Sequence, residues 1–357
     1  MSTVDEPRMV PRLEDRKAAI LKAIVQDYVR DGEPVGSQRL VAEWDLGVSA
    51  ATVRSDMVAL EEAGLLTQPH TSAGRVPTDA GYRYFVDQLA EAADLKPEQR
   101  AALEGLLLGS ADFEDLLRKA SGVLSRLTRF AALVAAPRID RSRLKHVELV
   151  HLGPRSVLAV FIADTGRVEK RMLEVAAPVE EHDVGRARHA VNEAVAGVRL
   201  SQAPDVVSGM AVGAPSELGD LLESVADAIR TGLVDTPAGA EHVFVGGTAN
   251  ILGVGSFERM EEARLVYAAL EEHVLLLQML HDVLEGGDPA VRIGGELSPP
   301  ELAVCSVVAA RYEASDAAGS LGVLGPTRMD YPRTLGAVQA VASSLEKAIA
   351  ELTGGHT

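Results

Sequence analysis

Apolar residues recur at helical spacing near the start of the chain, and this periodicity predicts the first elements. One apolar stripe runs along residues 16–30, and Gly32 and Pro34 follow it, so a helix is predicted to end there. Ser37 is a residue type that favours helix N-caps, and it predicts a short second helix over 38–43. The first stripe consists of Ile20, Leu21, Ile24, Val25 and Tyr28.

A third helix is predicted to begin after Ser49 and to end at Gly64. Helical geometry places Val53, Met57 and Leu60 on one side, which should pack against the first two helices. The opposite side carries small or polar residues and one arginine, and such a surface fits closely into a DNA major groove. The alternative is an ordinary amphipathic helix with a solvated outer side. The outward residues are Ala51, Thr52, Arg54, Ser55 and Val58.

The segment after this helix predicts a β-hairpin, with Leu65 and Leu66 in its first strand and Val76 in its second. Residues 68–75 form a tip rich in hydrogen-bond donors, which suits contact with DNA phosphates or the minor groove. A surface hairpin without a partner is the alternative. Two short helices followed by a wing form the layout of a winged helix-turn-helix, which binds duplex DNA. The predicted DNA-binding residues are Ser37, Arg39, Ser49, Ala51, Thr52, Arg54, Ser55, His70, Ser72 and Arg75.

Strand-like and helical patterns alternate along the rest of the chain, and antiparallel strands flanked by helices predict an α+β domain. A largely helical block lies at about 180–285. Its last helix, within 263–284, is apolar around most of its girth, so it needs either burial in its own domain or a subunit interface. The predicted strands cover 145–150, 156–163, 168–175, 302–310 and 320–324, and a closing helix covers 335–352.

Composition limits these interpretations. The chain has 357 residues, enough for two or three domains, and a formal net charge of −17. Residues 1–90 hold 10 Lys and Arg against 14 Asp and Glu, so DNA binding would depend on a few clustered arginines. Cys305 is the single cysteine, which excludes a disulfide framework. Without a signal-peptide pattern or a spanning apolar run, a cytoplasmic protein is expected.

Other candidate chemistry is sparse. Residues 245–250 are glycine-rich but lack the Gly-Lys-Ser/Thr ending of a phosphate loop, so a turn is predicted. Residues 325–331 offer Thr327 and Arg328 as donors for an anion, although a tight strand-to-helix connection is the favoured interpretation. The histidines show no metal-ligand spacing, and no catalytic triad can be assembled from local strings. We therefore predict no enzyme activity, no cofactor and no metal.

Four ordered strings near the N-terminus closely resemble the heat-inducible repressor family HrcA: GEPVGSQRL, VSAATVRSDMVALEEAGLL, PHTSAGRVPT and GYRYFVDQL. The resemblance returns near the C-terminus in VRIGGEL and LGVLGPTRMDYPR. It implies a multidomain α+β fold with a winged helix-turn-helix at 1–92. A GAF-like domain at 93–180 and 286–357 is then expected, interrupted by a mainly helical dimerisation domain at 181–285.

The same resemblance implies a function. A homodimer of this family is expected to bind an inverted-repeat operator in double-stranded DNA upstream of chaperone operons and to repress them. A chaperonin is expected to act as co-repressor by keeping the protein folded. Two alternatives stay open: a winged-helix regulator that responds to a small molecule, and a protein-interaction module on a scaffold or an unrecognised enzyme.

Overall fold

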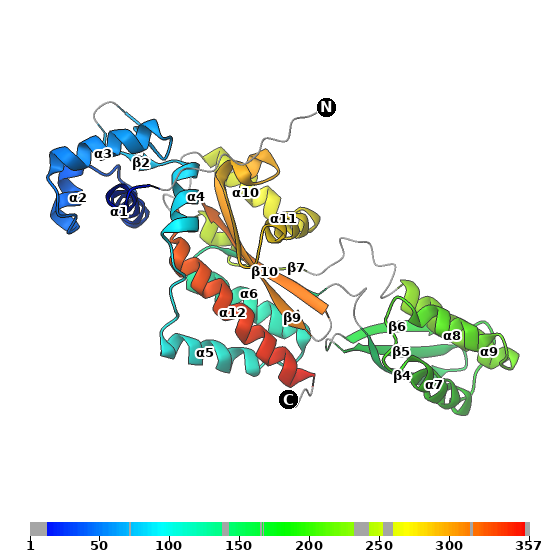
Figure 1. The fold of residues 1–357 in the computed structure, drawn as a ribbon. Helices are drawn as coiled ribbons and strands as arrows, with labels where there is room; N and C mark the ends of the chain where they lie inside the picture. Colours follow the sequence, from blue (N-terminus) through cyan, green and yellow to red (C-terminus); the bar gives the residue numbers. More distant parts are fainter. Residues whose placement is uncertain are drawn as a thin grey trace.

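The computed structural model describes residues 13–70, 73–137, 143–164, 166, 168–231, 243–252, 260–314 and 317–353 of the chain. Within these ranges the protein is an α+β molecule whose elements gather into three units (Figure 1). An N-terminal unit is followed by a unit built on a five-stranded sheet, into which a unit built on a three-stranded sheet is inserted. None of the described helices is both long and apolar enough to cross a membrane.

The N-terminal unit, residues 13–89, consists of helices around a small antiparallel hairpin. Its first helix ends at Gly32, as predicted, with a left-handed φ of 75° and an N–H that bonds to the Tyr28 carbonyl at 2.9 Å. The second helix begins at Ser37 itself with Gly36 as its N-cap, so the predicted capping by Ser37 is wrong. The elements are α1 (Asp15–Asp31), α2 (Ser37–Glu43), α3 (Ala50–Glu62), β1 (Leu66–Thr67), β2 (Val76–Pro77) and α4 (Asp79–Gln88).

The hairpin is tied to the segment between α1 and α2. Val35 and Arg75 exchange two backbone hydrogen bonds of 2.9 Å, which extend the pairing of β1 and β2 by one short contact. Gly74 lies so close to the Val35 backbone that a Cβ at this position would overlap the Val35 carbonyl group. Glycine is therefore needed where the hairpin crosses this segment.

The five-stranded unit contains an antiparallel sheet of order β7-β3-β10-β9-β8. Cys305 begins β9 in the core of this unit, and burial raises the pKa of its thiol to about 12. The elements are α5 (Pro97–Leu108), α6 (Phe113–Thr128), β3 (Ala131–Ala135), β7 (Val243–Gly246), α10 (Met260–Glu271), α11 (His273–Glu285), β8 (Ala290–Ile293), β9 (Cys305–Ala314), β10 (Ala317–Pro326) and α12 (Tyr331–Leu352).

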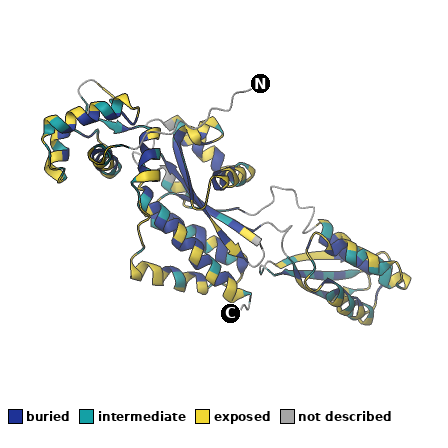
Figure 2. Cartoon of the chain, in the orientation of Figure 1, coloured by how far each residue is buried: buried dark blue, intermediate teal, exposed yellow. Residues whose placement is uncertain are grey.

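Both faces of the five-stranded sheet are covered by helices, and Figure 2 shows buried residues along its central strands. Successive side chains of a strand point to opposite faces, and β3 follows this rule. Ala132 and Val134 share a core with α6 and α12, whereas Ala131, Leu133 and Ala135 share one with α10 and α11. The first of these cores continues into the N-terminal unit, so the two units are packed against each other.

The three-stranded unit is a separate antiparallel sheet of order β4-β5-β6 with helices on one face. Inward side chains alternate along β5, where Val157, Ala159, Phe161 and Ala163 are buried against the helices. The elements are β4 (Leu144–Gly153), β5 (Ser156–Ala163), β6 (Val168–Glu174), α7 (Glu181–Val195), α8 (Ala203–Ala211) and α9 (Ser216–Ile229).

The described sheets divide the chain differently from the predicted domains. The sequence predicts the strands at 145–175 as part of the GAF-like domain, but they pair only with one another and share a core with α7, α8 and α9. The predicted single helix within 263–284 is two helices, separated at Glu272, and they pack on the five-stranded sheet. Among the described residues, the hydrophobic cores of the two sheets are therefore not separated at residues 180 and 286, the predicted domain boundaries.

The physical reason is that two strands of the five-stranded sheet were not predicted from the sequence. Strands β3 and β7 are short apolar runs without alternation of buried and exposed residues. Strand β3 is buried on both faces, and β7 lies at the edge of the sheet. Periodicity does not identify such runs as strands. Without them, the strands at 145–175 were grouped with the predicted strands 302–310 and 320–324, which overlap β9 and β10 of the five-stranded sheet.

Replacing Gly81 with alanine should destabilise the protein. A Cβ there would overlap the backbone carbonyl of Leu65, so α4 would have to move away from the hairpin. We expect the free energy of unfolding to fall by about 1–3 kcal/mol, measured by urea denaturation. Gly105 is the matched control, because it lies inside α5 with open space around its Cβ position, and Gly105→Ala should stabilise by about 0.4–1 kcal/mol. Equal effects of the two substitutions would contradict this account.

Candidate nucleic-acid interface

Helix α3 is held in place by one side and by its N-terminus. Val53, Met57 and Leu60 are buried, as predicted from their spacing. The Oγ atom of Ser49 accepts a hydrogen bond of 3.3 Å from the Thr52 N–H, so the predicted N-cap is confirmed. This cap fixes the first turn of the helix, because it satisfies one of the backbone N–H groups that lack a helical partner.

An ion pair adds a second constraint on α3. The guanidinium of Arg16 in α1 donates to both carboxylate oxygens of Asp56, at 2.7 and 3.2 Å. The Asp56 side chain is only 7% exposed, and the hydrogen bond to it raises the pKa of Arg16. Paired donors and acceptors of this kind are directional, so they resist rotation of α3 about its own axis.

The opposite side of α3, made of Ala51, Thr52, Arg54, Ser55 and Val58, faces solvent and is called here the outer side of α3. Four of these residues are exposed and Thr52 is half-buried. Val58 is 41% exposed, although its side chain is apolar. The five residues include no carboxylate, so the surface offers hydrogen-bond donors, methyl groups and one positive charge.

A groove of about 430 Å³ separates the outer side of α3 from the hairpin. It brings together three of the predicted DNA-binding residues, Ser37, Arg54 and Arg75. Gln68, which the sequence analysis did not select, lines the same groove and donates from Nε2 to the Ala73 carbonyl at 2.9 Å. An amide side chain at the edge of a predicted wing was the signal available in the sequence.

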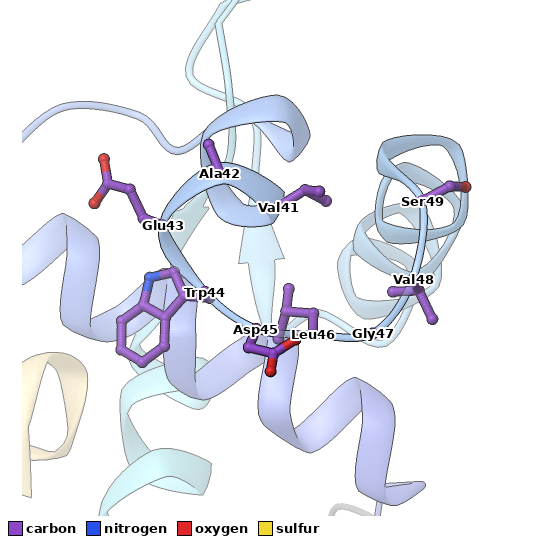
Figure 3. A pocket seen from close by; sticks show the side chains of 9 residues that line it. All are labelled: Val41, Ala42, Glu43, Trp44, Asp45, Leu46, Gly47, Val48 and Ser49. Atoms are coloured by element: carbon purple, nitrogen blue, oxygen red, sulfur yellow. The ribbon is translucent and has the colours of Figure 1, made fainter.

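A second, open hollow of about 700 Å³ lies at the turn between α2 and α3. Figure 3 shows Ser49 at the α3 end of this hollow, whereas Trp44 points away from Ser49. The indole N–H of Trp44 donates to Asp27 of α1 at 3.1 Å, so Trp44 anchors the turn from behind. Ser37 and Ser49 therefore line two different depressions, one at the N-terminal end of α2 and one at its C-terminal end.

The structure places Arg39 in a cluster of carboxylates. Its guanidinium lies 3.1 Å from Asp27, which is fully buried, and 3.1 Å from Glu43, and it also contacts Asp31. Ser37 is buried in the first turn of the same helix. Of these two predicted DNA contacts, Arg39 is therefore engaged by carboxylates, and Ser37 is mostly buried where it lines the groove.

The predicted hairpin contacts differ in their surroundings. The Arg75 guanidinium donates from Nε to Glu61 at 2.9 Å, and its side chain is 16% exposed. His70 is exposed at the hairpin tip, whereas Ser72 lies outside the described residues. Arg75 would have to exchange Glu61 for a phosphate before it touched DNA.

Most arginines of the N-terminal unit neutralise carboxylates away from the outer side of α3. Of the arginines described between residues 13 and 89, Arg54 alone pairs with no described acidic residue. The acidic balance of the sequence is thus compatible with a positive outer side of α3. The ion pairs are Arg16–Asp56, Arg30–Asp27, Arg30–Asp31, Arg30–Glu43, Arg39–Asp27, Arg39–Asp31, Arg39–Glu43, Arg75–Glu61, Arg83–Asp87 and Arg83–Glu296.

A family model and named relatives agree on one family. The family model described as the HrcA protein C-terminal domain matches residues 114–335. The heat-inducible transcription repressor HrcA of Frankia casuarinae is 44% identical over 343 residues, covering 96% of this chain and 99% of the relative. That of Thermobifida fusca is 44% identical over 331 residues, covering 92% and 95%.

One solved structure has the same overall fold. It is a crystal structure described only as that of a hypothetical protein, with a TM-score of 0.65 and 22% identity. The match covers 96% of this chain and 100% of the other. At this identity the likeness concerns the arrangement of the backbone.

Loss of the α3 N-cap should reduce stability. Ser49→Ala removes the oxygen that accepts from the Thr52 N–H, and we expect the free energy of unfolding to fall by about 0.5–2 kcal/mol. Ser55→Ala is the matched control, because Ser55 is exposed inside the same helix and should change stability by less than about 0.5 kcal/mol. Urea denaturation of both variants measures the difference, and an equal loss would exclude a specific capping effect.

Proposed function

The chain belongs to the HrcA family of heat-inducible transcription repressors, and from this premise we propose that it binds an inverted-repeat DNA operator as a dimer. It is a heat-shock transcriptional repressor by this membership. In the proposal the N-terminal unit is a winged helix-turn-helix, with α3 in the major groove and the hairpin as its wing. Chaperone operons are the proposed targets.

The guanidinium of Arg54, which is exposed and pairs with no described acidic residue, is the observation that carries this proposal. It can form two hydrogen bonds with guanine O6 and N7, or bind a phosphate. Ala51 would contact a thymine methyl group, and Thr52 and Ser55 either bases or phosphates. Ser49 lies at the helix N-terminus, where the backbone N–H groups favour a phosphate.

The hairpin residues have a different proposed role. His70, Ser72 and Arg75 would contact phosphates or the minor groove, which orients the protein without reading sequence. Arg39 and Ser37 would act indirectly by holding α2 in place. Arg39 is bound by the carboxylate cluster, and Ser37 is buried in the first turn of α2. DNA phosphates would therefore meet few charges, and affinity should depend on the fit of α3.

For the dimer interface we propose the open face of the three-stranded sheet. Its other face is covered by α7, α8 and α9, whereas Val150, Leu152 and Met172 are 40%, 55% and 59% exposed on the open one. The buried side chains of α11 pack on the five-stranded sheet, so that helix is a weaker candidate. A two-fold dimer would read both halves of an inverted repeat and combine their affinities.

The rows of side chains on the open face suit a second copy of the chain as its partner. Glu148, Val160 and Lys170 form one row across β4, β5 and β6, and Glu148 also accepts a hydrogen bond of 2.5 Å from Arg188 of α7. A two-fold axis parallel to β5 would place β4 of one protomer opposite β6 of the other. Each Glu148 would then face the partner's Lys170, and Val150 the partner's Met172.

The chaperonin is the proposed co-repressor. Occupation of the chaperonin by unfolded proteins at high temperature would leave the repressor without assistance in folding, and the operator would become free. Comparison of operator footprints at increasing temperature, with and without chaperonin, tests this part of the proposal. If chaperonin leaves the occupied fraction of the operator unchanged at every temperature, its role as co-repressor is excluded.

Arg54→Ala should weaken operator binding specifically. Loss of one bidentate base contact should lower affinity by about 1–3 kcal/mol, that is, roughly 5- to 150-fold, while dimerisation is unchanged. A footprint titration on the upstream region of the gene measures the effect. Arg186→Ala serves as the matched control, because Arg186 is 61% exposed on α7. An unchanged footprint for Arg54→Ala would exclude Arg54 from the interface.

Met172→Glu should weaken the dimer. The substitution puts a charge in the row formed by Val150, Leu158 and Met172, which the proposed interface would bury. The dimer dissociation constant should rise at least about tenfold, which corresponds to roughly 1.4 kcal/mol. Sedimentation equilibrium measures this constant. Val212→Glu is the control, since Val212 is 89% exposed beyond the end of α8, and a similar effect of both variants would argue against the sheet face.

A further inference from the structure

We propose that the contact between α4 and the turn after β8 is a positioning clamp that determines which spacing between operator half-sites the repressor accepts. The inference rests on the proposed function, because it requires a dimer on an inverted repeat. It adds residues that do not touch DNA but hold the N-terminal unit at a fixed angle to the five-stranded unit. Arg83 and Glu296 form the centre of this clamp.

The guanidinium of Arg83 is held by the five-stranded unit from two directions. It donates to both carboxylate oxygens of Glu296, at 2.9 and 2.5 Å, and to the backbone carbonyl of Val291 in β8 at 2.7 Å. Glu296 also accepts a hydrogen bond of 2.9 Å from the Ile293 N–H. A planar guanidinium bound in this way has one permitted orientation, so the contact fixes direction as well as distance.

A second contact lies one helical turn earlier in α4. The Asp79 carboxylate accepts a hydrogen bond of 3.1 Å from the Gly295 N–H. Gly294 has a left-handed φ of 55°, and a Cβ there would overlap the Asp79 carboxylate. The turn Gly294–Glu296 therefore fits α4 only because it carries glycine at this point.

A third contact joins α1 to the connection between β10 and α12. The Arg328 guanidinium lies 6.0 Å from the centre of the Tyr28 ring and against Gly32, where α1 ends. A cation at this place is favoured both by the ring and by the partial negative charge of a helix C-terminus. The contacts with Tyr28 and Gly32 account for the position of Arg328 without the anion site considered for residues 325–331.

Buried tyrosines complete the contact. The rings of Tyr82 in α4 and Tyr331 in α12 lie 5.7 Å apart, and both are buried. The Tyr331 hydroxyl donates to the Thr327 carbonyl and bonds to Ser306, each at 2.8 Å. The aromatic pair is thus attached rigidly to the five-stranded unit.

The clamp gives a role to two strings that the DNA interface leaves unused. VRIGGEL supplies the turn with Glu296, and LGVLGPTRMDYPR supplies Arg328 and Tyr331. None of the clamp residues lines the groove between α3 and the hairpin. Their contacts are with α1 and α4, which carry α3 and the hairpin.

A rigid attachment has a measurable consequence on DNA. One inserted base pair moves a half-site by about 3.4 Å and rotates it by about 34° around the DNA axis. Two N-terminal units held at a fixed angle to their five-stranded units follow this change less readily than two loosely attached units. The clamp should therefore appear as a steep dependence of affinity on spacer length.

The experiment uses the full-length protein and operators whose spacer is one base pair shorter, unchanged or one base pair longer. Wild-type affinity should fall at least about tenfold for either change, as expected for rigid half-site geometry. The affinity of Glu296→Ala should fall no more than about twofold across the series. Glu296→Gln keeps the side-chain volume, and its loss of affinity should lie between those of wild type and Glu296→Ala. Asp87→Ala is the matched control, because it removes a partner of Arg83 within α4 and leaves Glu296 in place.

Binding to a duplex with one half-site separates positioning from damage to the reading surface. Half-site affinity should be the same for wild type and Glu296→Ala. A wild-type spacer profile in both Glu296 variants would overturn the clamp while leaving operator binding intact. Parallel loss of half-site affinity would also overturn it, since Glu296 would then support the fold of the N-terminal unit. If the wild-type protein shows no operator preference, the proposed function and the clamp fail together.

Discussion

The structure depends on the one-sided attachment of α3. Val53, Met57 and Leu60 bury this helix against its neighbours, but apolar packing has no direction and would tolerate some rotation. The hydrogen-bonded ion pair between Arg16 and Asp56 supplies the missing direction. Contacts with base edges require positions accurate to about half an ångström. The proposed reading surface is therefore inseparable from the ion pair behind it.

An acidic chain that binds a polyanion needs a particular arrangement of charge. Here the arginines of α1 and α2 are paired with carboxylates of α1, α2 and α3, and the exposed Arg54 is left for a partner. Attraction to arbitrary DNA should be weak under these conditions, because few phosphates are neutralised. Such a protein relies on shape and hydrogen bonding at the correct site, which favours discrimination over general affinity.

The sequence predicted local structure better than assembly. The periodicity of residues 16–64 and the capping residue Ser49 are read within one or two helical turns, and these elements are observed almost as expected. The carboxylate cluster around Arg39 and the contact between Arg83 and Glu296 join residues from separate elements, which no local pattern encodes. Assignment of strands to sheets failed for the same reason, since pairing partners lie far apart along the chain.

Cys305 offers an internal reporter of opening. Burial raises the pKa of its thiol to about 12, which disfavours the reactive thiolate at neutral pH, and the side chain is fully buried. Oxidants and alkylating reagents should therefore reach it only when the five-stranded unit opens. The rate of iodoacetamide labelling then measures that opening directly, without an engineered probe, as temperature rises. Burial thus shields the single cysteine of the folded protein from oxidants.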